Sequence, residues 1–347
     1  VIVDRFPKKT ILFITQSLAM ILAFILGVLT LMDLATIPVI CVMAFMMGTV
    51  NAIDGPARQA FISQLVTKEQ LASAIALNSA IFNAGRIIGP GLAGMLIALT
   101  GSGGAFIFNG ISYLAIIIAL AFLKITENIS LKKLNPLSAI KEGILYSYSH
   151  PIIRVLLLFT GVVSVFGWSY TTIMPVIARE SFHLGADGLG YMFSVTGLGS
   201  LLATYLVGAH SKRIPSVLFI IGGNSIFCIS LILFAFSNNL GVALFLLFFT
   251  GLGLLSQAAT MNTIIQGIVK NEFRGRVMSL YILMFLGLAP LGNFEIGWLT
   301  ENVGISMALS INGAIVLIAG LILLFYQPSI QDAYRSYKKL NPDAVLV

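Results

Sequence analysis

The chain has 347 residues, of which 58% are hydrophobic and only 10% charged, and its mean hydropathy is +0.99. Soluble domains carry about 25% charged residues, so this composition excludes a water-soluble fold. It also excludes disordered chains and disulfide-rich secreted scaffolds, because the sequence holds 24 Phe and only two Cys. The net charge of +7 comes from cations in short loops between apolar stretches, a pattern typical of membrane topology rather than of a nucleic-acid-binding face.

Ten apolar runs of roughly 20 residues are long enough to cross the hydrocarbon core of a bilayer. In hydrocarbon every backbone amide must be hydrogen-bonded within its own segment, so runs this apolar are expected to be helices. The sequence therefore predicts an all-α integral membrane fold. The ten predicted helices cover residues 10–31, 36–53, 73–99, 105–123, 153–177, 187–208, 217–236, 240–266, 277–299 and 305–326.

Lysine and arginine fall almost entirely in one set of alternate loops. That set carries 18 of the 20 cations, whereas the opposite set carries Arg179 alone and Arg86 lies within a predicted span. Cation-rich loops face the cytoplasm under the positive-inside rule. We therefore expect a multi-pass protein of the plasma (inner) membrane, with both ends of this sequence in the cytoplasm.

One long connection, residues 124–152, separates the fourth predicted span from the fifth. Apolar residues recur there at helical spacing, and Asn135 and Pro136 supply a cap and a first turn. The pattern predicts a short amphipathic helix on the cytoplasmic surface, either as a linker that couples two halves or as a solvated spacer. The residues that define its apolar stripe are Leu137, Ile140, Ile144 and Tyr148.

An internal repeat relates the two parts of the chain. The loop at residues 65–70 resembles that at 268–273, and the same offset aligns Gly89 with Gly292. Four spans precede the central connection and six follow it, so we expect a twelve-helix protein whose first two helices lie outside this sequence. The predicted organisation is an N-terminal half at 1–123, the linker at 124–152, a C-terminal six-helix half at 153–326 and a cytoplasmic tail at 327–347.

Two motifs resemble the major facilitator superfamily. Residues 1–9, VIVDRFPKK, match the loop between its second and third helices from the position after a leading Gly, although Pro7 stands where many members have Gly. Residues 85–94, GRIIGPGLAG, are similar to the Gly-Pro antiporter motif of drug exporters, and small residues of this kind let helices approach closely. The resemblance is to the subgroup of macrolide efflux and enterobactin exporters, and it implies the fold of that superfamily. The residues to which it assigns a conformational role are Asp4, Arg5, Gly85, Gly89, Pro90 and Gly94.

Charged and polar residues at membrane depth are candidates for the substrate path. A charge at a helix centre costs roughly 2.5 to 3.5 kcal/mol on insertion scales, so Arg86 and Glu295 invite a functional explanation, the alternatives being an ion pair or a snorkelling side chain. The family arrangement implies a central cavity lined by amides and aromatic rings, whereas each residue singly is typical of helix packing. The predicted substrate-binding residues are Arg86, Asn83, Asn51, Trp168, Tyr170, Gln257 and Glu295.

The sequence therefore predicts a secondary active transporter that exports an amphipathic organic compound, drug-like or siderophore-like, by alternating access. The phosphate-binding loop of ATPases does not occur in it, so we expect coupling to protons rather than ATP, with no catalytic activity, cofactor or metal. The expected partners are the small-molecule substrate, the coupling proton and the lipid bilayer, without nucleic acid, and we expect a monomer. The alternatives are a nutrient uptake permease and a membrane binding or sensory protein that does not transport.

Overall fold

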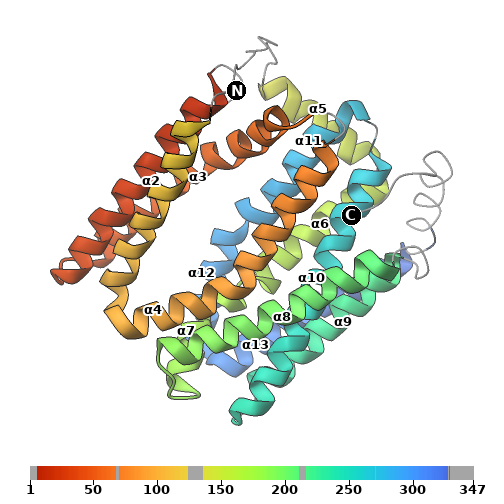
Figure 1. The fold of residues 1–347 in the computed structure, drawn as a ribbon. Helices are drawn as coiled ribbons and strands as arrows, with labels where there is room; N and C mark the ends of the chain where they lie inside the picture. The colour runs from red at the N-terminus through yellow and green to blue at the C-terminus, as the bar shows by residue number, and fades with distance from the viewer. Residues whose placement is uncertain are drawn as a thin grey trace. The chain divides into compact units, whose positions relative to one another are not determined.

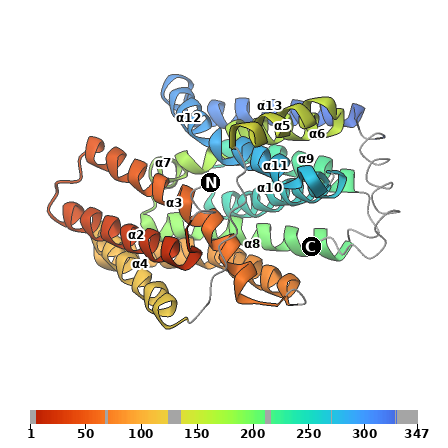
Figure 2. The same ribbon diagram turned by 90° about the horizontal axis from the view of Figure 1, so that it is seen from above.

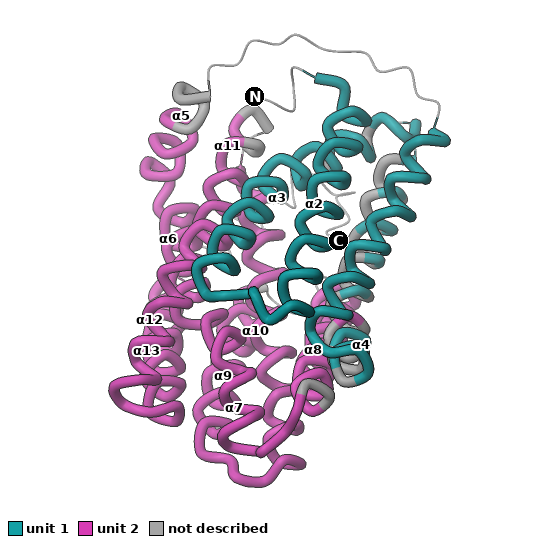
Figure 3. Tube along the Cα trace, turned by 90° about the vertical axis from the view of Figure 1, so that its left-hand side faces the viewer, with its two compact units in different colours: residues 1–85, 92–136 teal, residues 86–91, 137–347 magenta. Residues whose placement is uncertain are grey.

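The computed structural model describes residues 6–67, 70–123, 136–210, 216–269, 271–326 and Pro328, and within these ranges the regular elements are all helices. The helices form two compact units, coloured separately in Figure 3. The first comprises residues 1–85 and 92–136, and the second comprises residues 86–91 and 137–347. The central connection is thus divided, because its helix belongs to the second unit.

The first unit contains α2 (Lys8–Leu31), α3 (Ile37–Leu65) and all of α4 (Leu71–Phe122) except residues 86–91. Glycines allow α2 to lie directly against α4, since a Cβ on Gly27 would come within 2.8 Å of the Ile107 side chain and one on Gly110 within 2.8 Å of Phe24. Lys9 Nζ donates to the carbonyl oxygen of Leu123 at 2.6 Å and so binds a carbonyl at the end of α4.

The helix α3 extends well beyond the end at residue 53 that the sequence predicts. It continues through Pro56 to Leu65, although a proline inside a helix removes one backbone hydrogen bond. The extension is stabilised by packing, because Ala57 and Phe61 are buried with Ile11 of α2 and Leu120 of α4. Hydropathy alone underestimates this helix because its last turns carry polar residues on the opposite face.

The long helix α4 combines two predicted spans, 73–99 and 105–123. Gly101 has φ of 71° and breaks the helical geometry between them, so α4 consists of two helical legs joined at a bend (Figure 1). A positive φ of this size is readily adopted by glycine and disfavoured for other residues.

The second unit is built around α8 (Ala186–His210), α9 (Ser216–Ala235) and α10 (Leu240–Ile268), which lie side by side (Figure 1, Figure 2). Glycines bring these backbones together: Gly251 of α10 faces the Thr196 carbonyl of α8, and a Cβ on Gly223 of α9 would lie 2.8 Å from the Gly253 carbonyl oxygen of α10. Close approach of helix backbones at small residues is a characteristic form of packing in membranes.

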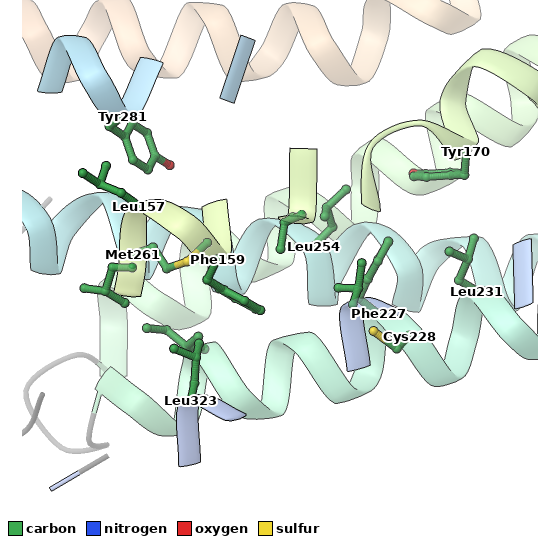
Figure 4. Close-up of a cluster of buried hydrophobic side chains, with 14 of the residues drawn as sticks. Leu157, Phe159, Tyr170, Phe227, Cys228, Leu231, Leu254, Met261, Tyr281 and Leu323 are labelled. Carbon is green, nitrogen blue, oxygen red and sulfur yellow. The ribbon is translucent and has the colours of Figure 1, made fainter. Parts of the chain in front are cut away.

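Two spans of the second unit are interrupted by π-helical segments. One span consists of α6 (Pro151–Val162), η1 (Val163–Gly167) and α7 (Tyr170–Glu180). The other consists of α11 (Asn271–Ile282), η2 (Leu283–Gly287) and α12 (Ala289–Val303), and Gly304 turns the chain into α13 (Ile305–Phe325). A continuous buried cluster of apolar side chains joins these spans to α8, α9 and α10, and Figure 4 shows part of it.

The central connection contains the helix α5 (Pro136–Ser149), in the region where the sequence predicts a short amphipathic helix. Its buried residues differ from the predicted stripe. Tyr146 stacks on Phe273 of α11 with ring centroids 4.3 Å apart, and Glu142 forms an ion pair with Arg276, while Ile144 and Tyr148 of the stripe are exposed. Contacts with α11 therefore select a face of α5 that the apolar periodicity does not indicate.

Nine helices among the described residues are long and apolar enough to cross a membrane, and the first leg of α4 corresponds to the one remaining predicted span, 73–99. Their outward surfaces are rich in large apolar side chains, including Phe45, Leu158, Ile229 and Ile318. Exposed apolar surface on this scale requires lipid around it. The structure thus confirms the all-α membrane fold.

Candidate functional site

The two π-helical segments η1 and η2 lie against each other in the second unit. In η1 the Trp168 N–H donates to the carbonyl oxygen of Val163, five residues earlier, at 2.9 Å. In the second span Pro290 follows η2 and cannot donate to the carbonyl four residues before it, which favours a change of hydrogen-bond register there. Short π-helical segments are rare and occur frequently at functional sites.

A hydrogen bond and an aromatic cluster join η1 to η2. Ser164 Oγ donates to the backbone carbonyl of Phe285 at 2.6 Å. The ring of Trp168 meets Phe285 edge-on at 5.4 Å, and Tyr281 lies parallel to Phe285 at 6.3 Å. Aromatic rings in these arrangements add about 0.5–1.5 kcal/mol per pair beyond the burial of their area. The junction is therefore a specific contact between the two interrupted spans.

A polar network lies immediately beyond η1. Asn312 of α13 donates through Nδ2 to Glu295 Oε2 of α12 at 3.1 Å and to Ser169 Oγ at 3.2 Å. Ser169 and Asn312 are buried, and the side chain of Glu295 is half-buried. The network thus connects three spans around one carboxylate.

The backbone around this network is close-packed. Gly292 of α12 lies directly against the backbone of Val165 in η1, without room for a side chain. Its repeat partner Gly89 differs, because a Cβ there would meet no described atom within 4 Å. The close contact expected at Gly89 is therefore seen at the corresponding glycine of the second unit.

Two predicted binding residues of the second unit lie in its interior. Tyr170 packs on Phe227 at 6.2 Å within the buried cluster of Figure 4. Gln257 of α10 is 0% exposed, and neither its amide oxygen nor its amide nitrogen has a hydrogen-bond partner among the described residues. Leaving a buried amide unpaired costs about 1–3 kcal/mol in proteins, so Gln257 is the most demanding polar group of this unit.

The predicted site residues of the first unit are less completely defined. Asn51 lies on α3 with an exposed side chain, and Gly85 lies on α4 with no described atom within 4 Å of a Cβ built there. The remaining predicted positions fall outside the described residues or side chains: Asp4, Arg5, Asn83, Arg86, Pro90 and Gly94.

A second polar cluster surrounds a buried carboxylate in the first unit. Asp54 lies inside α3 and accepts hydrogen bonds from Thr15 Oγ1 at 2.8 Å and Gln16 Nε2 at 2.7 Å, both on α2. Arg58, one turn later, forms an ion pair with it at 2.5 Å. The Asp54 and Arg58 spacing of four residues is the sequence signal for the pair, whereas the α2 donors follow only from the packing.

Other binding features are weaker. A groove of 340 Å³ lies between α2 and α3 and is lined mainly by apolar side chains. Of its threonines, Thr15 is already bonded to Asp54 and Thr49 to the Phe45 carbonyl, so few groups could orient a ligand. In the part of the chain that the structure describes, no cluster of three His, Cys, Asp or Glu side chains is placed to hold a metal ion. The network at Glu295 is therefore the strongest candidate site.

Comparison with known proteins decides the family. Residues 1–346 match the transmembrane secretion effector family. The chain belongs to this family of the major facilitator superfamily. It is 30% identical to the staphyloferrin A transporter of Staphylococcus aureus over 332 residues, which cover 93% of this chain and 81% of that protein. It is 22% identical to the multidrug efflux pump Tap of Mycolicibacterium fortuitum, over 88% of this chain and 75% of the pump.

Solved structures support the same fold. A bacterial homologue of the iron transporter ferroportin, in an inward-facing state, aligns with a TM-score of 0.66 and 16% identity, covering 93% of this chain and 84% of that one. A transporter of the POT family in complex with 5-aminolevulinic acid aligns with a TM-score of 0.71 and 13% identity, covering 95% and 83%. The predicted resemblance to the major facilitator superfamily is thus confirmed, and the protein is a membrane transporter rather than an enzyme.

Proposed function

We propose that this transporter exports an amphipathic organic compound, siderophore-like or drug-like, by alternating access and in exchange for protons. The names of its relatives support the substrate class, since one transports staphyloferrin A and another is a multidrug efflux pump. The proposal places the cation-rich loops and both ends of this sequence in the cytoplasm, because the loops of one side hold 18 of the 20 cations.

The network at Glu295 is the observation that carries the proposal. An ionisable side chain in a membrane span is expensive and is generally retained for a substrate or ion pathway. Here the carboxylate has an amide partner at 3.1 Å, and Trp168 directly precedes the Ser169 of the same network in the chain. A site that combines a carboxylate with an aromatic residue suits a compound with an apolar body and polar or cationic groups.

The proposal retains the predicted substrate-binding residues of each unit. In the second unit these include Glu295, Trp168 and Arg86, and in the first unit they are Asn83 and Asn51. Gln257 and Tyr170 support the path from the interior of the second unit. We assign conformational roles to the two motifs, namely Asp4 and Arg5 in the loop motif and Gly85, Gly89, Pro90 and Gly94 in α4.

Transport by the full-length protein in proteoliposomes tests this function. The probes are staphyloferrin A and the amphipathic dye ethidium, each measured with and without an imposed pH gradient. We expect movement of at least one probe that accelerates when the gradient drives protons against it. Vesicles that carry neither probe would contradict the substrate class, and transport indifferent to the gradient would contradict proton coupling.

The direction of transport is tested in the same vesicles. Protein molecules inserted in either orientation are distinguished with a membrane-impermeant protease that cuts exposed cation-rich loops. Export predicts that probe leaves through the face opposite those loops. Accumulation toward the cation-rich face would instead identify an uptake permease.

A further inference from the structure

Asn312 lies between two side chains that accept hydrogen bonds from its amide nitrogen. It is 1% exposed, and its Nδ2 serves both Glu295 Oε2 at 3.1 Å and Ser169 Oγ at 3.2 Å. Its Oδ1 is buried and has no hydrogen-bond partner among the described residues. Buried polar atoms are nearly always paired, so an orphan oxygen on the same amide as two satisfied donors calls for an explanation.

We propose that Ser169, Glu295 and Asn312 form the binding site of the coupling proton, and that Asn312 is the positioning residue that responds to the protonation of Glu295. The inference rests on the proposed function, because it assumes proton exchange. With Glu295 ionised, the carboxylate accepts from Asn312 Nδ2, as in this structure. A proton arriving from water converts the carboxylate into a carboxylic acid that can donate.

Protonation reverses the hydrogen-bond directions in the network. Rotation of the Asn312 amide by half a turn brings Oδ1 to face Glu295 and Ser169, and both hydroxyl groups can then donate to it. Oδ1 then accepts both hydrogen bonds, and Nδ2 takes the position that Oδ1 leaves. The one covalent change is the O–H bond that Glu295 forms with the incoming proton, which stays there until the network reverts. Ser169 thereby changes from acceptor to donor.

Among the described residues, few titratable groups lie on the elements that pack against the helix of Glu295. The elements packed against α12 are α13, η1, η2 and α7, and the first three contain no titratable side chain. On α7 and α12 the titratable groups besides Glu295 are Tyr170, which is buried on Phe227, and three exposed side chains near the ends of the helices, Arg179, Glu180 and Glu301. Arg179 lies ten residues from Ser169, roughly 15 Å along a helix. Within the described residues no cation forms a salt bridge with Glu295.

The network adjoins the π-helical segment η1. Ser169 follows η1 by two residues, and α13, which carries Asn312, packs on η1. Ser164 then joins η1 to η2 through the Phe285 carbonyl. A π-helical segment can shift its hydrogen-bond register at lower cost than an α-helix, so a change at Ser169 reaches the junction of two spans directly.

Two readouts on the full-length protein test the inference. The first compares ethidium exchange without a gradient to ethidium transport driven by a pH gradient. We expect Glu295→Gln to lose the stimulation, so that an imposed pH gradient no longer accelerates ethidium transport over the rate that the same variant shows without a gradient. The second records infrared difference spectra after a pH jump, in which the carboxylic acid band of Glu295 should disappear in Glu295→Gln and change its pH midpoint and frequency in Asn312→Leu.

Controls separate this inference from folding and from the proposed function. Asn302→Ala removes an exposed amide on the same helix as Glu295 and should leave both readouts unchanged. Asn312→Asp supplies a second variant if Asn312→Leu does not insert. Gradient stimulation that survives in Glu295→Gln, or a Glu295 band indifferent to Asn312, would overturn the inference. A wild-type protein without gradient stimulation would instead refute proton coupling itself, while the infrared arm still decides whether Asn312 responds to Glu295.

Discussion

Substitution of Gly251 by Ala tests whether the α8–α10 contact supports the second unit. A Cβ at this position would overlap the backbone carbonyl of Thr196, and Gly199 lies in the same way against the carbonyl of Phe248. A helical carbonyl cannot move alone, so α8 must be displaced as a whole. Overpacking costs typically 1–3 kcal/mol, and backbone overlap belongs at the upper end of that range. Alanine recovers about 1 kcal/mol through its higher helix propensity, which leaves a net loss of about 2 kcal/mol.

Thermal unfolding of the purified protein in detergent measures this loss. The matched control is Gly222→Ala on the neighbouring α9, where a Cβ would meet no described atom within 4 Å. That variant should equal or exceed the parent in stability, because only the propensity of alanine acts there. If Gly251→Ala and Gly222→Ala unfold at the same temperature, the close approach of α8 and α10 does not limit stability and the packing argument fails.

Four further substitutions probe single contacts. Asp54→Leu should lower stability by about 1–3 kcal/mol in the same assay, because it leaves buried donors on α2 unpaired. Arg58→Ala should lower stability by less than about 1 kcal/mol, since that side chain is 53% exposed. Equal losses in the two variants would contradict this ranking. Ser164→Ala should lower the unfolding temperature through loss of about 1 kcal/mol, and an unchanged temperature would mean that the bond between η1 and η2 is not stabilising. Arg276→Ala should raise deuterium uptake in residues 137–149 with little change in unfolding temperature, whereas unchanged uptake would show that α5 docks without its ion pair.

Hydropathy was sufficient to predict the spans because lipid imposes one requirement on all of them. A backbone in hydrocarbon must satisfy its own hydrogen bonds, so length and apolarity identify a helix without knowledge of its neighbours. The helix α5 was equally predictable, from its spacing and from Pro136. The end of α3 was not, because residues 54–65 are stabilised by packing of Ala57 and Phe61 rather than by apolarity.

The candidate site was only partly accessible to sequence reasoning. Glu295 was identifiable as a charge within a span, and Pro290 offers a local reason for η2. The segment at η1 has no such residue: VSVFG is an ordinary apolar stretch, and its widened turn depends on contacts with α12 and α13. Asn312 gave no signal because a single Asn in a span is typical of helix packing, and its role depends on which groups the fold brings to it.

The second unit combines a stiff part with a compliant part, and hydrogen exchange should separate them. In α8, α9 and α10 the backbones touch at glycines on both faces of α10, so opening any of these helices disrupts two interfaces together. At η1 and η2 the hydrogen-bond register is already altered, and the groups around it are joined by single bonds such as that from Ser164 to Phe285. Local opening is favoured where few contacts must break, so amides of residues 163–169 and 283–289 should exchange faster than those of residues 247–258. Exchange is measured in nanodiscs, where lipid shields both regions equally, and the Ser164→Ala variant should widen the difference. Equal protection of the two regions would mean that the π-helical segments are as rigid as the glycine-packed helices, and they would then be unsuited to carry a conformational change.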